Sequence, residues 1–177
     1  MIPISVATFI KLQKPSSGSF QEVEVSNVSA KDHMASNQEK FSALKSFNLP
    51  IDQYAITGSG PLGIRNLKEI GDIDIIVTIE LWDDLAAKYG ITEENGVKKI
   101  VLPGGIIEAF QEGSFSTAAV DRKAPTIASS IAKAEIIDGL PFDAIENILY
   151  YKRKEAREKD LKDILLIEEW MRTHKDD

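Results

Sequence analysis

Residues 72–77, Asp-Ile-Asp-Ile-Ile-Val, constrain the fold of this chain more than any other segment. Side chains alternate between the two faces of a β-strand, so Asp72 and Asp74 share one face while Ile73 and Ile75 share the other. Acidic residues are poor strand formers, and neighbouring carboxylates repel each other unless a cation lies between them. The pattern therefore predicts a half-buried strand with a cation site, and carboxylate oxygens suit Mg²⁺.

A glycine-rich turn precedes this strand. Residues Gln53–Thr57 read as a short strand that runs into Gly58, Ser59 and Gly60. Glycines can adopt positive φ and let a phosphate approach the backbone, and a serine adds a hydroxyl donor. Alone, such a segment is typical of an ordinary strand-to-helix turn. Beside two carboxylates, it favours a site for a nucleoside triphosphate.

Taken together, these elements resemble the nucleotidyltransferase superfamily, which has the DNA polymerase β-like fold. That family has an apolar residue, Gly, then Gly or Ser, a spacer, and then Asp, an apolar residue and Asp or Glu. Here Gly58-Ser59 and Asp72-Ile-Asp74 match this pattern, whereas Thr57 replaces the usual apolar residue. The resemblance implies that Gly58 and Ser59 bind the phosphates, and that Asp72 and Asp74 are catalytic and hold one or two Mg²⁺ ions.

The resemblance also implies an arginine near the phosphates and a third carboxylate on a neighbouring strand. Arg65 is the nearest match for the arginine, displaced by a residue or two, and Lys68 is the alternative. For the third acid, Glu108 lies in the only later β-like run with an embedded acid, 106–110. An unpaired acid between apolar neighbours is costly to bury, which favours Glu108 as a metal ligand or catalytic base. A solvated glutamate on an edge strand is the alternative.

The C-terminal part of the chain carries a second informative pattern. Lys152 follows Ile145, Ile148 and Leu149 on one apolar helical face. Asp163 comes eleven residues after Lys152, which at about 3.6 residues per turn returns close to the same face of a continuous helix. A lysine and an aspartate on the core side predict a functional site or a buried ion pair. The other charges are typical of a solvated helix with pairs such as Glu155–Lys159.

This stretch also looks like the C-terminal part of bacterial nucleotidyltransferase toxins of the AbiEii type and their stand-alone relatives. Those proteins carry a lysine, then Arg-x-Lys-Asp, then a second aspartate three residues on. Lys152, the run from Arg157 to Asp160, and Asp163 match this layout in order. The resemblance implies that Lys152 binds the nucleotide triphosphate and that Arg157, Asp160 and Asp163 organise the site. The chain is shorter than the full toxins, so toxin activity is not implied.

The remaining patterns predict an α/β (α+β) domain over residues 36–177, with a small mixed sheet, helices packed on it and a C-terminal helical extension. Residues 1–35 read equally as a hairpin or as an irregular arm. We expect strands at 53–57, 72–79, 97–102, 106–110 and 134–137, with 97–102 and 106–110 joined in a hairpin by Pro103-Gly104-Gly105. We expect helices at 37–47, 80–89 and 126–134, a short helix or turn at 61–68, and one helix from 142 to about 174, with or without a break.

Composition narrows the function. The chain has 177 residues, 43% of them hydrophobic, and no run that approaches the length of a membrane span, so no membrane partner is expected. It contains no cysteine, which makes a cytoplasmic location the default expectation. A net charge of −7 argues against broad affinity for nucleic acid.

We therefore expect an enzyme that transfers a nucleoside monophosphate from an NTP to an acceptor hydroxyl or phosphate and releases pyrophosphate. The acceptor is open: a small molecule, a tRNA end and a protein side chain are all used within this fold. One alternative is a catalytically inactive nucleotide-binding or regulatory protein of the same fold. Another is an α/β domain in which Asp72 and Asp74 are plain surface residues.

Overall fold

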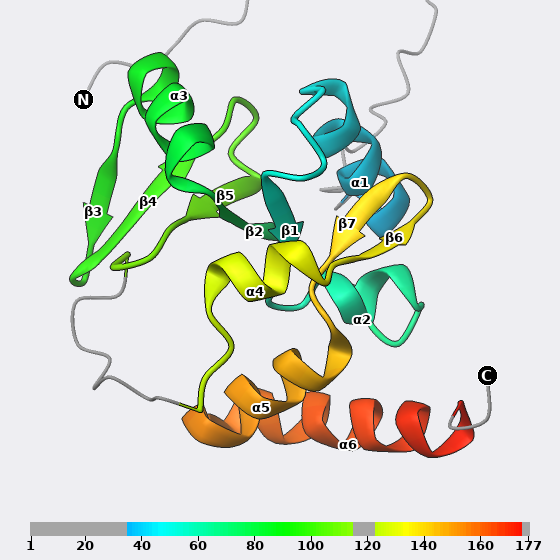
Figure 1. Ribbon diagram of the computed structural model, residues 1–177. Coiled ribbons are helices and arrows are strands. Elements are labelled where there is room, and N and C mark those ends of the chain that lie inside the picture. Colours follow the sequence, from blue (N-terminus) through cyan, green and yellow to red (C-terminus); the bar gives the residue numbers. More distant parts are fainter. Residues whose placement is uncertain (1–34, 115–122, 175–177) are drawn as a thin grey trace, which may run out of the picture. The chain divides into compact units, whose positions relative to one another are not determined.

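The computed structural model describes residues 35–114 and 123–174, which belong to one compact unit. These residues form a mixed α/β fold with six helices and a seven-stranded mixed sheet (Figure 1). The α/β class predicted from the sequence is thereby confirmed. The hairpin or arm predicted for residues 1–35 lies outside the described residues, apart from residue 35.

The elements alternate along the chain between helices and short strands. The strands are β1 (Tyr54–Ile56), β2 (Ile73–Val77), β3 (Thr92–Glu94), β4 (Val97–Val101), β5 (Ile107–Phe110), β6 (Glu135–Ile137) and β7 (Leu140–Phe142). The helices are α1 (Asn37–Ser46), α2 (Gly60–Ile64), α3 (Ile79–Tyr89), α4 (Ile127–Ala132), α5 (Ile145–Glu155) and α6 (Glu158–Thr173). No helix of the described segments is long and apolar enough to cross a membrane.

The strand order places the sequence-predicted site in the middle of the sheet. The order is β3-β4-β5-β2-β1-β7-β6, so β2 lies between β5 and β1. Strand β2 is antiparallel to β1 and parallel to β5, and β7 is parallel to β1. Segments that are far apart in the sequence therefore meet at one place, and the turn after β1 lies beside the acidic start of β2.

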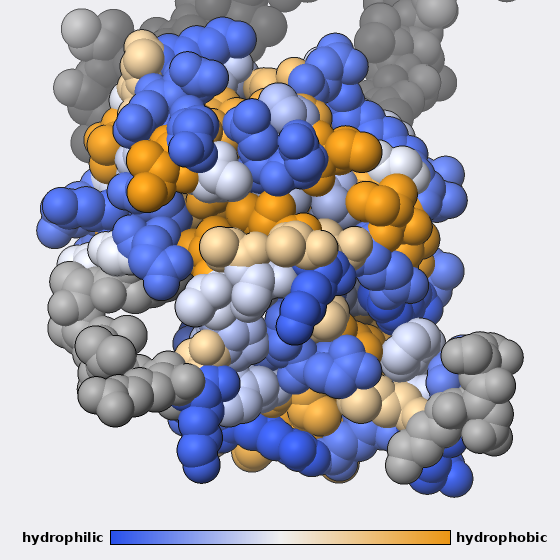
Figure 2. All heavy atoms as spheres, viewed as in Figure 1, coloured by the Kyte–Doolittle hydropathy of each residue, from blue (hydrophilic) through white to orange (hydrophobic). Residues whose placement is uncertain are grey.

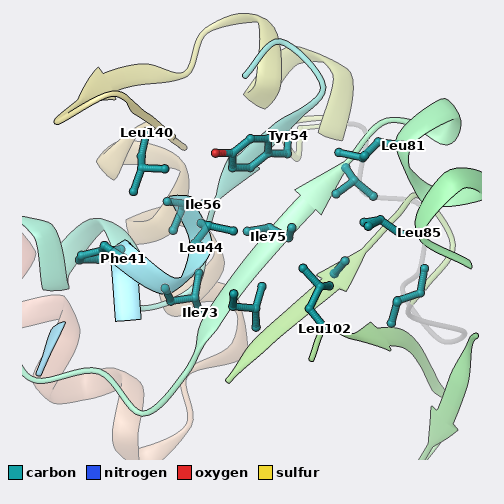
Figure 3. Packing of buried hydrophobic residues seen from close by; sticks show 14 of the residues in the cluster. Phe41, Leu44, Tyr54, Ile56, Ile73, Ile75, Leu81, Leu85, Leu102 and Leu140 are labelled. Carbon is teal, nitrogen blue, oxygen red and sulfur yellow. The ribbon is translucent and has the colours of Figure 1, made fainter. Parts of the chain in front are cut away.

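The main core lies on the face of β2 that carries Ile73, Ile75 and Val77. Ile73 and Ile75 are fully buried, and Figure 3 shows them surrounded by apolar side chains from α1 and α3. Phe41 of α1 also meets Phe142 of β7 edge to face, with ring centroids 5.5 Å apart. Burying a side chain of this size stabilises a fold by about 1.5–3 kcal/mol. Asp74 lies on the opposite face, which leaves it available for a site.

A second apolar cluster holds the C-terminal helices against α2. It joins side chains from three helices: Leu62, Ile145, Ile148, Leu149 and Ile167. Because α2 directly follows the glycine-rich turn, this cluster brings α5 and α6 close to that turn. In the view of Figure 2, hydrophilic side chains cover much of α5 and α6 with apolar side chains among them, and Leu161 and Leu165 of α6 are exposed.

Two local expectations were wrong in this region: the start of the C-terminal helix and the Glu155–Lys159 pair. Residue 142 ends strand β7 (Leu140–Phe142), and the helix expected from residue 142 begins only at Ile145. The helical stretch then breaks at Ala156, which has φ 49°, so α5 and α6 are separate helices. The predicted Glu155–Lys159 pair does not form; Glu155 instead pairs with Arg157 at 2.6 Å. Strand β3, at the edge of the sheet, was not predicted.

Candidate functional site

The glycine-rich turn packs directly onto the first carboxylate strand. Gly58 has φ +61°, and a Cβ added to it would lie 2.3 Å from Oδ2 of Asp74. The backbone N–H of Thr57 donates to the carbonyl of Asp74 at 2.9 Å, which fixes the register of turn and strand. Only glycine fits at residue 58 with this carboxylate in place. The structure thus brings together two of the residues that the sequence predicted.

Ser59 and Gly60 complete the turn. Ser59 is the N-cap residue of α2, but its hydroxyl makes no capping hydrogen bond. A Cβ on Gly60 would lie 2.2 Å from the Cγ2 atom of Ile56, so this glycine is required by packing. The Ser59 side chain is half-buried beside the turn, and its hydroxyl forms no capping hydrogen bond to α2.

Asp72, Asp74 and Glu108, which we call the acidic site, are brought together by strand register. Asp74 and Glu108 are direct partners in the parallel pair of β2 and β5, so their side chains share one face. Asp72 lies just before β2 and is exposed. Among residues 35–114 and 123–174, no three acidic or histidine side chains are placed to hold a metal by themselves. Mg²⁺ typically binds through one or two carboxylates plus substrate phosphates, which fits Asp72 and Asp74.

The negative charge of Asp74 is only partly compensated by basic side chains of the described residues. Burial, together with the charges of Asp72 and Glu108, raises the pKa of Asp74 to about 6. The more distant charges of Lys159 and Lys152 act in the opposite direction without compensating fully. Within the described residues, no ion pair to Asp74 is formed. A cation placed here would stabilise the carboxylate form.

Glu108, in contrast, forms an ion pair with a lysine side chain. The Nζ atom of Lys99 lies 2.8 Å from Oε1 of Glu108 and 3.4 Å from Oε2 of Glu94. The hydrogen bond to Glu108 raises the pKa of Lys99 above its usual value, so the ammonium form is favoured. Sequence reasoning missed Lys99. The alternation of Val97, Lys99 and Val101 along the predicted hairpin was the signal that could have placed it on the same face as Glu108.

Lys152 and Asp163 form the buried ion pair that the sequence offered as one possibility. The Nζ atom of Lys152 lies 2.7 Å from Oδ2 of Asp163 and 3.6 Å from Oδ1 of Asp160. Lys68 reaches the other Asp163 oxygen at 2.8 Å. Burial raises the pKa of Asp163, but hydrogen bonds from Lys152 and Lys68 outweigh it and leave that pKa below the usual value. This network ties α5 and α6 to the segment after α2.

Arg157 and Asp160 close the turn between the last two helices. The Nε atom of Arg157 lies 2.6 Å from Oδ2 of Asp160, and its backbone N–H donates to the same oxygen at 3.2 Å. The hydrogen bond from Arg157 lowers the pKa of Asp160, whose side chain is fully buried. The geometry is that of a helix cap, so these residues organise the helix pair.

Arg65 lies among structural partners. Its guanidinium donates to the carbonyl of Pro61 at 3.0 Å, pairs with Glu135 and lies 4.9 Å from the ring centroid of Trp170. Its side chain is only 8% exposed. Arg65 thus clamps α2 to β6 and α6, and none of these partners is a residue of the predicted site.

Another buried carboxylate, which sequence reasoning missed, lies behind the turn. Asp143 follows β7, and its Oδ2 accepts a hydrogen bond from the Thr57 hydroxyl at 3.4 Å. Asn147 donates to its Oδ1 at 2.7 Å and to the Ser130 hydroxyl at 3.2 Å. Burial raises the pKa of Asp143 above its usual value, although these hydrogen bonds act against the shift. The network links α4 and α5 to the residue before Gly58.

Cavity shape does not mark the acidic site. One surface cavity of about 150 Å³ lies between α1, α2 and the β6–β7 turn, and a second lies on α5. Neither is lined by a residue predicted for nucleotide or metal binding. The candidate site is therefore defined by its side-chain chemistry.

Comparison with known proteins adds no further constraint. No protein-family model matches the chain, and neither a curated protein nor a solved structure does.

Proposed function

We propose that this protein is a Mg²⁺-dependent nucleotidyltransferase, with a nucleotidyltransferase-like fold. The observation that carries the proposal is the direct contact of the Gly58 turn with the Asp74 carboxylate. It brings a backbone that a phosphate can approach next to a carboxylate that forms no ion pair with any described residue. Such a pairing suits a metal-bound triphosphate better than a free metal ion or a free phosphate.

Asp72 and Asp74 would hold the Mg²⁺ ion, and the ion would supply charge neutralisation at the phosphates. The backbone around Gly58 and Ser59 would then receive the terminal phosphates, with the uncommitted Ser59 hydroxyl as an extra donor. In this arrangement the protein contributes positioning and electrostatic stabilisation, which dominate catalysis of phosphoryl and nucleotidyl transfer.

Lys159 is the exposed cation that we assign to the leaving pyrophosphate. It lies at the start of α6, and its charge acts on Asp74 more strongly than that of Lys152. It forms no ion pair with any described residue. Lys152 is buried and held by Asp163, so it would act on the triphosphate through its charge and would touch it only by leaving that partner.

The test combines nucleotide binding with pyrophosphate release. Calorimetric titrations of ATP, GTP, CTP and UTP with Mg²⁺ would measure binding, and a coupled assay would measure pyrophosphate in the presence of small-molecule, tRNA and protein acceptors. We expect Asp72→Asn with Asp74→Asn to abolish both. Asp52→Asn, an exposed acid elsewhere on the surface, is the matched control and should change neither.

An inactive nucleotide-binding protein is the second candidate, and the Lys99–Glu108 pair is the observation that favours it. A third carboxylate already paired with lysine is a weaker base than a free one. Binding of a nucleotide without pyrophosphate release across the acceptor panel would support this second candidate. Unchanged nucleotide affinity in the double aspartate variant would overturn both.

A further inference from the structure

The Lys99 ammonium group is built into the sheet beside the third carboxylate. Val101 is the register partner of Glu108 in the antiparallel pair of β4 and β5. Lys99 lies two residues before Val101, so its side chain shares that face and stands diagonally from Glu108. On its other side, Lys99 contacts Glu94 of β3 at 3.4 Å. Three adjacent strands thus supply a carboxylate, an ammonium and a second carboxylate.

Charge compensation is therefore divided unequally within the acidic site. Glu108 and Asp74 are register partners on strands about 4.8 Å apart, close enough for their charges to interact strongly. Glu108 has an ammonium group at 2.8 Å, whereas no described residue forms an ion pair with Asp74. A divalent cation beside Asp72 and Asp74 would be attracted by carboxylates that form no ion pair with a described residue. Beside Glu108 it would be repelled by the Lys99 ammonium group.

We propose that Lys99 takes the place of a second divalent cation, so that this protein binds one metal ion, through Asp72 and Asp74, and not two. The inference rests on the proposed function, because it concerns the same site. A second ion at Glu108 would have to displace the Lys99 ammonium or sit beside it, and like charges at that separation repel each other. The side chains of Lys99 and Glu108 are each 20% exposed, so solvent screens this repulsion only in part.

The experiment counts bound Mn²⁺, used as a paramagnetic replacement for Mg²⁺, by electron paramagnetic resonance. The full chain is titrated with Mn²⁺ in the presence of a non-hydrolysable ATP analogue, with the analogue alone as blank. We expect one protein-dependent Mn²⁺ per chain in the wild type and two in Lys99→Met. Lys98→Met, which removes an exposed lysine from the neighbouring position, should still bind one.

Lys99→Met with Glu108→Gln provides a second variant, which removes both charges of the pair and so leaves the net charge beside Asp74 unchanged. If Glu108 does not ligate the ion of the wild type, this double variant should bind one Mn²⁺ with the wild-type affinity. A loss of about tenfold or more, the size expected when a group supporting a metal is removed, would overturn the inference. Thermal unfolding of each variant shows whether it is folded before its metal content is interpreted.

The outcomes separate the inference from the function on which it rests. Two Mn²⁺ ions of similar affinity in the wild type, or an unchanged count in Lys99→Met, would overturn the role of Lys99 and leave the nucleotidyltransferase proposal standing. Absence of any protein-dependent Mn²⁺ in the wild type would instead overturn the proposed function. A count that rises from one to two only when Lys99 is removed supports both.

Discussion

Gly58 and Asp74 are in contact across the β1–β2 pair, and the contact leaves no room for a side chain on residue 58. The hypothetical Cβ would lie 2.3 Å from the carboxylate oxygen Oδ2, far inside van der Waals separation. The backbone of Gly58 is also left-handed, with φ +61°. Sterics and conformation therefore both select glycine next to the carboxylate that we assign to the metal.

The first prediction concerns Gly58→Ala. The added methyl group must push the Asp74 carboxylate aside, so we expect nucleotide affinity in the presence of Mg²⁺ to fall by about tenfold or more, as for other losses of a metal-positioning contact. Calorimetric titration measures the change. Gly139→Ala is the matched control, because residue 139 has φ +75° but open space around its Cβ. If both variants lose affinity equally, backbone strain and not the carboxylate contact explains the effect.

The second prediction is that Asp74→Asn stabilises the folded protein at neutral pH. Burial and nearby carboxylates raise the pKa of Asp74 from 3.8 to about 6, so ionising this group costs the folded state free energy. The cost is fully present above pH 6, shrinks as the pH falls through 6, and vanishes below the unfolded pKa of 3.8. From the size of the shift, the gain in Asp74→Asn is up to about 3 kcal/mol at pH 8 and about half of that at pH 5.

Urea unfolding at these two pH values measures the gain. Asp163→Asn is the control with the opposite sign, because hydrogen bonds from lysines hold the pKa of Asp163 below its usual value despite burial. That variant should lose stability above pH 4 or so, where the wild-type carboxylate is charged in both states. A destabilised Asp74→Asn protein at pH 8 would contradict the electrostatic description of the acidic site.

The third prediction concerns the buried pair of Lys152 and Asp163. Lys152→Met leaves a buried carboxylate with only Lys68, and we expect a loss of about 3–5 kcal/mol in the free energy of unfolding. Lys152→Met with Asp163→Leu removes both charges and should recover most of that loss. Denaturant titration gives both values. Arg153→Met is the surface control, since it breaks only the exposed pair with Glu168 and should cost less than about 1 kcal/mol.

The fourth prediction separates the two roles considered for Arg65. Its guanidinium pairs with Glu135 and lies over Trp170, so Arg65→Ala should lower the free energy of unfolding by about 1–2 kcal/mol. Nucleotide affinity should stay within a factor of about two, because the contacts of Arg65 are structural. Calorimetric titration and thermal unfolding of the same preparation test this directly. A large loss of affinity at unchanged stability would favour the phosphate-binding role that the motif resemblance implies.

Local sequence patterns predicted a helix, strand or hairpin correctly where one segment contained both the periodic side chains and the residues that end the element. The spacing of apolar residues predicts α1, the alternation at 72–79 predicts β2, and Pro103-Gly-Gly predicts the β4–β5 hairpin; each is present. Strand β7 was missed because it has three residues and includes Pro141, which is unfavourable inside a sheet. It exists because β1 and β6 pair with it on either side.

The sequence correctly predicted that Lys152 and Asp163 lie together, but the reason given, one continuous helix, was wrong. A continuous helix would have placed Lys152 and Asp163 on the same face of one helix. The chain instead turns at Ala156, in a left-handed conformation, and no glycine or proline at that point signals the turn. The two residues meet because the helices pack against each other, with Lys152 and Asp163 facing across the contact.

The sequence by itself determined the inventory of the candidate site: a glycine-rich turn, two carboxylates on one strand face and a third acid on a later strand. Those features are local, since they depend on residue type and on alternation within a few positions. Only the tertiary structure decided which lysine forms an ion pair with which carboxylate. Lys99 reaches Glu108 through strand register, and Lys152 reaches Asp163 through helix packing. Both pairings depend on how distant segments are placed in space, and that placement leaves Asp74 with no ion-pair partner among the described residues.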